Sequence, residues 1–318
     1  MYKNVKSVIL KLLKTHGGLT AFLCRVLNLL GLSNLSSKVA LRTGHIPDVV
    51  NINVSHAGVY RAPFKMYSHS GKDLVVAEIW ASGWDKFEQP LPRVMAAFAE
   101  ICEGTFLDVG ANTGFYSFLL QTVNPRLSVH LFEPYPPALN LLSSNLRLNN
   151  LYVEGGSRLK IFDYAVGEEN GRARLYVPLQ DHGLVESSCS LDSEFKDSHS
   201  AIIEVDVRTL DSHAADYQIG DVAMIKIDVE GFESSVLAGS KAVIESCRPV
   251  IFIEILKNAK VDFIEEIRDR SNYLTFRLAA PSQIIDEPKV GFDNNSWNHL
   301  MVPREKAYLV EQVKKQLR

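Results

Sequence analysis

The stretch Thr105-Phe-Leu-Asp-Val-Gly-Ala-Asn-Thr-Gly-Phe-Tyr-Ser117 decides the fold of this chain of 318 residues. An apolar run that carries Asp108 near its end is followed by Gly110 and Gly114 on either side of Asn112, and then by a second apolar run. This order predicts a buried strand, a glycine turn and a helix. In an open parallel sheet, ligands bind at such a turn, where the glycines let the backbone approach them closely.

The chain after residue 91 repeats the alternation of strand and helix. Near-continuous apolar strands separated by helices are typical of a parallel sheet that is covered on both faces. The sequence therefore predicts an α/β fold with a mostly parallel, seven-stranded sheet. The expected strands are residues 105–109, 128–132, 159–162, 222–227, 249–255, 274–278 and 299–302, and the expected helices are 92–103, 116–123, 137–149, 232–245 and 260–270.

Two segments depart from this alternation. Residues 1–90 form an expected N-terminal accessory segment, in which helical spacing over residues 1–40 predicts two short amphipathic helices and a polar, turn-rich texture from about residue 50 predicts short strands. The helices either pack on the main domain or on a second copy in a homodimer, or they rest on a membrane surface. The main domain, residues 91–318, contains an insertion at about 168–220 that reads as a β-ribbon around a polar loop.

The composition is that of an ordinary globular protein, with 34 Lys and Arg against 37 Asp and Glu and a formal net charge of -3. No basic stripe is interleaved with aromatic residues, which argues against a nucleic-acid partner. The four cysteines lie far apart without a CxxC pair, and no apolar run reaches 18 residues. We therefore expect a cytoplasmic protein, and peripheral association with the inner face of the membrane stays open.

What the glycine turn lacks indicates its cofactor. The dinucleotide pattern G-x-G-x-x-G is absent because Asn112 occupies the second glycine position, and the phosphate loop G-x-x-x-x-G-K-[ST] is absent as well. A carboxylate at Asp108 opposes a pyrophosphate but attracts an ammonium or a sulfonium group. The turn therefore favours S-adenosylmethionine. An NAD(P)-dependent oxidoreductase remains the alternative, and it would have to tolerate Asn112.

Two further strand ends supply candidate cofactor-binding residues. Glu133 follows the strand 128–132, where an acid accepts hydrogen bonds from both ribose hydroxyls in dinucleotide folds. Asp163 and Ala165 follow the third strand and are expected beside the adenine. For Asp163 in particular, ordinary turn chemistry is the competing interpretation.

The fourth strand carries the most unusual charges. Period-two alternation places Lys226, Asp228 and Glu230 on one side of it. Three charges beside a buried strand are costly unless they are paired or used, so we interpret them as catalytic, with a purely structural Lys226 to Asp228 ion pair as the alternative. Asp228, Glu230 and Glu254 would also suit a hard cation such as Mg²⁺, but no metal signature accompanies them and no metal site is predicted.

Several motifs together resemble the FkbM-type methyltransferases over about residues 100–305. They are Asp108-Val-Gly-Ala-Asn-Thr-Gly114, Phe132-Glu-Pro134, Asn145 with Asn149-Asn150, Ala165-Val-Gly167, Thr209-Leu-Asp211, Ile225-Lys-Ile-Asp-Val-Glu-Gly231, and Arg248-Pro249 with Ile253-Glu254. The resemblance implies a Rossmann-like class I fold with an antiparallel final strand, S-adenosylmethionine as cofactor, and O-methylation of hydroxyls on sugars or polyketide-type products. Residues 1–90 lie outside it.

We therefore expect an O-methyltransferase that acts on a glycan, a glycolipid or a glycosylated metabolite. In-line methyl transfer to an alcohol requires alignment of the reacting atoms and removal of the hydroxyl proton. Asp228 and Glu230 are equal candidates for the base, and Lys226 would hold them ionised or stabilise the incipient alkoxide. His182, in the inserted loop, is a further candidate base or a solvated loop residue. A non-catalytic scaffold with a vestigial site is the remaining alternative.

Overall fold

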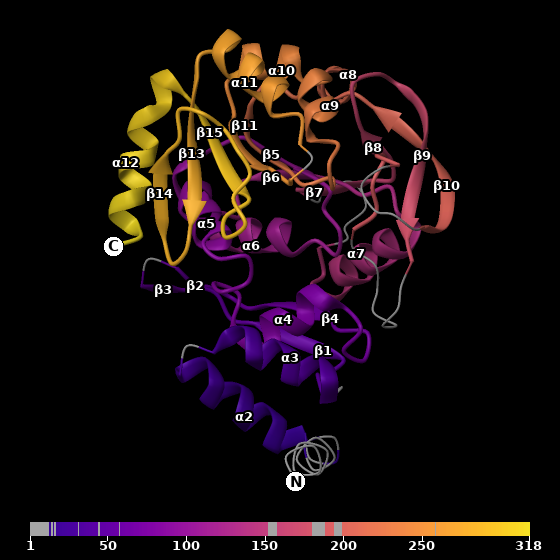
Figure 1. Ribbon diagram of the computed structural model, residues 1–318, viewed down its shortest axis with the longest axis vertical. Helices are drawn as coiled ribbons and strands as arrows, with labels where there is room; N and C mark the ends of the chain where they lie inside the picture. Colours follow the sequence, from indigo (N-terminus) through magenta and orange to yellow (C-terminus); the bar gives the residue numbers. More distant parts are fainter. Residues whose placement is uncertain are drawn as a thin grey trace.

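A computed structural model of the chain describes residues 13, 15, 17–30, 32–43, 45–56, 58–151, 158–179, 188–193, 199–257 and 259–318. Its centre is an eight-stranded sheet with the strand order β14-β13-β15-β12-β11-β5-β6-β7 (Figure 1). The strands are β5 (Thr105–Val109), β6 (Ser128–Phe132), β7 (Leu159–Phe162), β11 (Val222–Ile227), β12 (Val250–Glu254), β13 (Tyr273–Ala279), β14 (Gln283–Asp286) and β15 (Asn298–Pro303).

The five strands from β7 to β12 run parallel, and β15 lies antiparallel between β12 and β13. The α/β, Rossmann-like prediction is therefore confirmed, including the antiparallel final strand. The predicted count of seven strands is wrong, because β14 adds a hairpin edge to β13. Of its four residues only Ile284 is buried, so this edge strand lacks the apolar run by which the inner strands were recognised.

Helices cover both faces of the sheet, as Figure 1 shows. Side chains that alternate along β5 belong to separate core clusters, with Phe106 in one and Leu107 in the other. The first cluster packs under α5 (Leu91–Ile101), α6 (Phe115–Val123) and α12 (Ala307–Gln316), and the second under α8 (Leu210–Asp216), α9 (Glu233–Ala238), α10 (Lys241–Cys247) and α11 (Val261–Arg270). α7 (Pro136–Leu148) follows β6, and the short 3-10 helix η1 (Arg304–Lys306) precedes α12.

The helix predicted over 232–245 is in fact two helices, α9 and α10, which break near Gly239. A Cβ atom at this glycine would lie 2.0 Å from the carbonyl oxygen of Gly167. The carbonyl of Gly239 also accepts a hydrogen bond from the backbone N–H of Asp211 at 3.0 Å. The close approach to the base of the insertion therefore interrupts a helix that periodicity alone continues.

The N-terminal part forms a layer below the sheet in Figure 1. It consists of α2 (Gly17–Leu29), α3 (Ser33–Thr43), β1 (Val49–Ile52), β2 (Ser55–His56), β3 (Val59–Tyr60), β4 (Phe64–Tyr67) and α4 (Leu74–Ser82). Phe64 stacks on Phe118 of α6 with ring centroids 5.9 Å apart, and Asn145 of α7 accepts the backbone N–H of Tyr67 at 2.8 Å. Buried side chains from both sides of residue 90 thus join one core cluster.

The first of the two expected N-terminal helices falls on residues that the structure does not describe, except for Leu13 and Thr15. Within the described ranges, the structure contains no helix with the length and apolarity needed to cross a bilayer.

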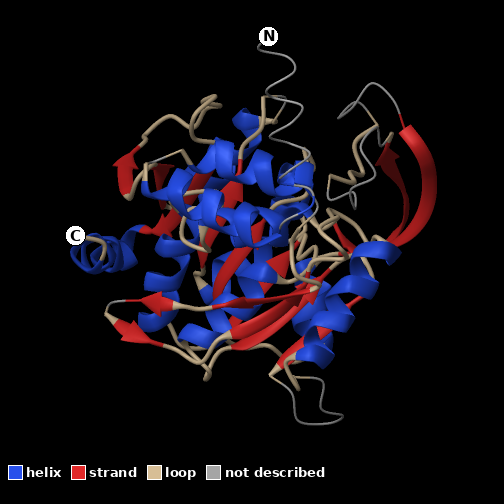
Figure 2. Ribbon diagram, turned by 90° about the horizontal axis from the view of Figure 1, so that it is seen from below, coloured by secondary structure: helices blue, strands red, loops and turns tan. Residues whose placement is uncertain are grey.

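The insertion is a curved ribbon that stands to one side of the sheet in Figures 1 and 2. β9 (Gly171–Pro178) and β10 (His199–Arg208) pair antiparallel, and β8 (Ala165–Val166) pairs parallel with the base of β10. The base of this ribbon therefore lies next to the carboxyl ends of the sheet strands, where a ligand is expected.

Candidate active site

A cavity of about 310 Å³ lies at the carboxyl ends of β5, β6, β11 and β12. This is the place where open α/β sheets bind ligands, and the volume is within the range of small-molecule sites. The walls include α4, the segment before α5, the glycine turn after β5, the start of α6, the turn after β6, the base of the ribbon, the ends of β11 and β12, and Trp297.

The glycine turn joins β5 to β6 and closely approaches the end of β11. The backbone N–H groups of Gly110 and Ala111 donate to the carbonyl of Phe132 at 3.1 and 3.0 Å, which joins β5 to β6. Gly110 has φ +81°, and a Cβ atom there would lie 1.9 Å from the carbonyl oxygen of Asp228. Only glycine fits this contact. Gly110 and Asn112 line the cavity.

Gly114 serves packing instead. A Cβ atom at Gly114 would lie 2.5 Å from Cδ1 of Leu142 and 2.7 Å from Cε2 of Phe118, both of which belong to helices. The residue is the N-cap of α6 with φ +92°, and it is not among the residues that line the cavity. Its role as a cofactor-binding residue stays a prediction.

Glu133 lies where the sequence predicts, at the end of β6 and on the cavity wall. Its carboxylate accepts the backbone N–H of Asn112 at 2.9 Å and that of Tyr135 at 2.8 Å. Burial raises the pKa of Glu133 to about 7, and these two hydrogen bonds offset part of the rise. Each carboxylate oxygen keeps a lone pair with which it can accept a ribose hydroxyl.

Asp108 lies behind the turn rather than on the cavity wall. It is 1% exposed, and its Oδ2 accepts the hydroxyl of Ser117 at 2.6 Å. Its Oδ1 is buried and meets no hydrogen-bond donor among the described residues. Burial raises the pKa of Asp108, and the nearby Lys226 opposes the rise. The predicted direct contact between Asp108 and a bound cation remains a prediction.

Of the other predicted site residues, only some line the cavity in the structure. Asp163 is exposed and is not among the cavity-lining residues, whereas Ala165, two residues later, lines the cavity. His182 lies outside the described residues, so its candidacy as a base stays a prediction.

Lys226 near the end of β11, and Asp228 and Glu230 just after that strand, all line the cavity. Val229 lines it as well, because the chain leaves the strand after Ile227 and strict alternation ends there. The catalytic roles of the three charged residues stay predictions. Lys226 is buried, and its Nζ donates to Oδ2 of Asp228 at 2.8 Å. The same ammonium lies 4.8 Å from the ring centroid of Tyr116. Burial lowers the pKa of Lys226, but the carboxylates of Asp228, Asp108 and Glu88 outweigh burial and raise it overall. Lys226 therefore stays charged near neutral pH.

Glu88 is a site residue that sequence analysis missed. It lies in the segment before α5 with φ +45°, and its Oε2 accepts the hydroxyl of Tyr116 at 2.5 Å. Burial and then the charge of Asp228 raise the pKa of Glu88, and Lys226 opposes them. No local pattern indicates this role, because Glu88 reaches the cavity only through the packing of a segment that is remote in sequence from the strand ends.

Negative charge dominates the cavity wall. Lys226 is the only Lys or Arg among the described lining residues, and it faces six carboxyl groups, those of Glu78, Glu88, Glu133, Asp228, Glu230 and Glu254. Burial, and next the charges of Asp228 and Glu230, raise the pKa of Glu254. Such a wall suits a cationic ligand and opposes a pyrophosphate. No group of three or more His, Cys, Asp or Glu side chains in the described part of the chain is arranged to hold a metal ion.

Tyr164 marks the ribbon side of the cavity and was also missed. Its hydroxyl lies 2.6 Å from Nδ1 of His213, and Nε2 of His213 lies 2.8 Å from Nδ1 of His130. Burial lowers the pKa of His213 to about 3 and that of His130 to about 4, so both imidazoles are neutral at neutral pH. The buried chain of hydrogen bonds fixes the orientation of the Tyr164 ring beside the apolar residues Ala165 and Leu175.

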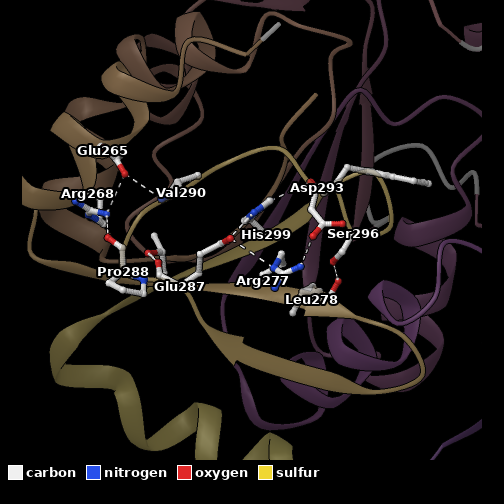
Figure 3. Close-up of polar contacts among 12 residues, drawn as sticks. Glu265, Arg268, Arg277, Leu278, Glu287, Pro288, Val290, Asp293, Ser296 and His299 are labelled. Carbon is white, nitrogen blue, oxygen red and sulfur yellow. Dashed lines mark hydrogen bonds and ion pairs between the residues drawn. The ribbon is translucent and has the colours of Figure 1, made fainter. Parts of the chain in front are cut away.

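A second charged cluster, here called the β13–β15 cluster, lies outside the cavity and is drawn in Figure 3. Arg277 pairs with Asp293 at 2.6 Å and with Glu287 at 3.5 Å, and Nε2 of His299 lies 2.8 Å from Oε2 of Glu287. Arg268 lies 3.6 Å from Glu265 in the same region. Positive and negative side chains alternate through this cluster, so each charge meets an opposite one.

Comparison with known proteins identifies the family. The profile of the methyltransferase FkbM domain matches residues 108–278. The 2-O-methyltransferase NoeI of Sinorhizobium fredii is 24% identical over 165 residues, which are 49% of this chain and 65% of that protein. Methyltransferase 1 of Beauveria bassiana is 23% identical over 148 residues, 42% of this chain and 57% of that protein. The chain thus covers less than two thirds of the length of either relative.

Solved structures are similar at low identity. A methyltransferase FkbM from Methylobacillus flagellatus KT is 19% identical with a TM-score of 0.42, over 72% of this chain and 53% of that chain. A SAM-dependent methyltransferase from Agrobacterium tumefaciens is 9% identical with the same TM-score of 0.42, over 80% and 70%. The resemblance that the motifs indicate is confirmed by the profile match, which spans more than half of the chain. The chain belongs to the FkbM methyltransferase family.

Proposed function

We propose that this protein transfers a methyl group from S-adenosylmethionine to a hydroxyl group of a sugar or of a glycosylated molecule. The observation that carries the proposal is the pairing of Lys226 with Asp228 on an acidic cavity wall directly beside the glycine turn. Family membership supports methyl transfer, and it favours that activity over the dinucleotide-dependent and scaffold alternatives.

The cavity residues fit the proposed cofactor. When bound, S-adenosylmethionine supplies an electrophilic methyl group on a positively charged sulfur. Glu133 would accept its ribose hydroxyls, and Tyr164 and Ala165 would contact its base at the ribbon side. The excess of carboxyl groups over the single ammonium of Lys226 suits the sulfonium and ammonium charges. No donor among the described residues reaches Oδ1 of Asp108, which leaves hydrogen-bonding capacity unused just behind the turn.

Asp228 is the residue that we assign to the hydroxyl proton. Lys226 holds one of its two carboxylate oxygens at 2.8 Å, which fixes the direction of the group at the end of β11. A carboxylate in this position can accept the proton of an acceptor hydroxyl, and the buried ammonium can stabilise the developing alkoxide. Glu230 lines the same cavity and is the alternative base.

The acceptor side of the cavity combines aromatic rings with acids. Phe87, Tyr116 and Trp297 line it together with Glu78 and Glu88. Aromatic faces stack on the apolar faces of sugar rings, and carboxylates accept hydrogen bonds from hydroxyls. The same carboxylates repel anionic groups. We therefore expect neutral or amine-bearing sugars as acceptors, and not uronic acids or sugar phosphates. The S. fredii relative NoeI is a 2-O-methyltransferase, which is in keeping with a hydroxyl acceptor.

A methyl-transfer assay tests this assignment. Radiolabelled S-adenosylmethionine is incubated with the full chain and matched glycosides that are neutral, amine-bearing or anionic. We expect transfer to members of the first two groups and none to the third. Asp228→Asn should abolish transfer, while Asp286→Asn, which changes an exposed carboxylate on the edge strand β14, should not affect it. Transfer to anionic glycosides alone would contradict the proposed acceptor class.

A further inference from the structure

The N-terminal helices carry an exposed apolar surface. Six large apolar side chains in this short stretch are solvent-exposed, and we call them the N-terminal face: Leu19, Phe22, Leu29, Leu30, Leu32 and Leu35. Phe22 is 64% exposed, Leu29 87% and Leu30 67%. The opposite side of α2, with Thr20, Cys24 and Leu27, is already buried. α2 is thus apolar on both sides, although one of them faces solvent, which is unusual for a surface helix.

The N-terminal segment also carries an excess of positive charge. Residues 1–47 contain seven Lys and Arg, at positions 3, 6, 11, 14, 25, 38 and 42, and no Asp or Glu. The whole chain has 34 Lys and Arg against 37 Asp and Glu, so the remaining 271 residues are distinctly acidic. Arg25 and Lys38 are exposed on the two helices that carry the N-terminal face. Cationic and apolar side chains therefore occur together in one part of the protein.

We propose that the N-terminal face docks on an anionic lipid surface. A bilayer interface accepts both kinds of side chain, because leucine and phenylalanine insert below the headgroups while lysine and arginine bind anionic headgroups. A second copy of this chain fits less well, because two such faces would bring Arg25 and Lys38 of one copy near the same positive charges of the other. The charge complementarity therefore selects a negatively charged membrane over a homodimer.

The position of the face places the cavity near that membrane. α4 contacts both α2 and α3, and its residues Leu74, Val75 and Glu78 line the cavity. One helix thus separates the N-terminal face from the proposed active site. The docking proposal itself stands on exposure and charge alone, so it does not depend on methyl transfer being the activity.

Flotation of the full chain with lipid vesicles tests the proposal. One set of vesicles is pure phosphatidylcholine and the other contains about 30 mol% phosphatidylglycerol, a composition near that of anionic leaflets. We expect binding to the anionic vesicles that is about tenfold stronger or more, and that weakens as salt is added. Equal binding to both sets, or binding to neither, would overturn the proposal.

Two double variants locate the contact. Phe22→Ser with Leu29→Ser removes apolar area, and Arg25→Glu with Lys38→Glu reverses two charges; each should lower anionic-vesicle binding about tenfold. The matched controls are Tyr308→Ser, which changes a side chain that is 60% exposed on α12, and Lys315→Glu, and neither should reduce binding. Circular dichroism and thermal unfolding confirm that each variant is folded.

Light scattering of the same samples without lipid tests whether a second copy of this chain binds the N-terminal face instead. We expect that the N-terminal face does not hold two copies together. A dimer that Phe22→Ser with Leu29→Ser dissociates would assign the face to a second copy and would overturn the proposal. Vesicle binding that both double variants retain would overturn it as well.

Discussion

The cavity wall and the β13–β15 cluster both contain charged side chains that are buried or partly buried, but they differ in how those charges are balanced. On the cavity wall, among the residues that the structure describes, six carboxyl groups face one ammonium, that of Lys226. In the β13–β15 cluster, Arg268 pairs with Glu265 and Asp269, and Arg277 pairs with Glu287 and Asp293. Glu287 also shares a close contact with His299 (Figure 3). We infer that a charged cluster is a candidate site where its charge is left uncompensated beside a cavity.

The pKa shifts express the same contrast. Burial raises the pKa of Glu88, Glu133 and Glu254, so keeping these carboxyl groups ionised in the unliganded cavity costs free energy. A cationic ligand would lower that cost. Burial raises the pKa of Glu287 in the β13–β15 cluster as well, but there the protein itself supplies the nearest cation, Arg277, which opposes the rise.

The largest effect is expected for Asp228→Asn. Loss of the proposed base should lower kcat for methyl transfer by about 100-fold or more, the usual contribution of general-base catalysis. The corresponding change in the β13–β15 cluster, Asp293→Asn, should leave kcat within about twofold, since Asp293 contacts Arg277 and not the cavity. Steady-state kinetics with both variants checks this prediction, and equal losses would remove the distinction between the two clusters.

The next effect concerns cofactor affinity. Glu133→Gln keeps the size of the side chain but removes its negative charge and one acceptor of the backbone N–H groups of Asn112 and Tyr135. We expect the Kd for S-adenosylmethionine to rise about tenfold or more. Glu287→Gln in the β13–β15 cluster is the matched control, and its Kd should equal that of the unchanged protein. Calorimetry measures both; an unchanged Kd for Glu133→Gln would remove Glu133 from the binding site.

Stability should respond with opposite signs in the two clusters. Glu254→Gln removes one of the excess carboxylates and should stabilise the unliganded protein by about 1 kcal/mol. Asp293→Asn leaves Arg277 with less compensation and should destabilise it by a similar amount, about 1 kcal/mol. Urea unfolding without ligand measures both. A loss of stability in Glu254→Gln would show that the cavity carboxylates are compensated after all.

The smallest effect is a difference in pH dependence. The folded-state pKa of Glu133, about 7, lies above its ordinary value of 4.5, so the folded state holds the proton more tightly. The contribution of this group to the stability of the protein is therefore lost as pH rises from 4.5 to about 7. Burial lowers the pKa of His299 to about 4, below its ordinary 6.5, so that group loses stability as pH falls from 6.5 to about 4.

Two variants separate these contributions. As pH rises from 5 to 7, the free energy of unfolding of Glu133→Gln should increase relative to that of the unchanged protein by about 1 kcal/mol. As pH falls from 7 to 5, that of His299→Gln should increase relative to the unchanged protein by about 1 kcal/mol. Urea unfolding at both pH values provides the differences. Parallel profiles for the two variants would contradict the opposite signs.

The sheet could be predicted because its strands are covered on both faces. β5, β6 and β11 follow the apolar runs to the residue, since burial on two sides leaves little room for polar residues. The edge strand β7 also begins and ends where predicted, although its Lys160 is exposed. The edge strand β14 and the break at Gly239 escaped prediction for different reasons. The first is mostly exposed, and the second depends on a contact with Gly167 that no local pattern encodes.

The candidate site was predictable only where strand ends supply it. Glu133, Lys226 and Asp228 follow from their position after a strand or from alternation along one. Asp108 shares the register of Lys226 across β5 and β11, yet it points to Ser117 instead of lining the cavity. Glu78 and Glu88 come from the N-terminal part, whose packing against the sheet is a long-range contact without a sequence signature.

The central claim is that the acidic cavity beside the glycine turn receives S-adenosylmethionine. Calorimetric titration of the full chain with S-adenosylmethionine, S-adenosylhomocysteine and NADH, repeated with Glu133→Ala, tests it most directly. We expect saturable binding of the two sulfur compounds, weakened by the substitution, and no binding of NADH, whose pyrophosphate the carboxylates repel. Binding of NADH alone, or cofactor binding that Glu133→Ala leaves unchanged, would contradict the claim.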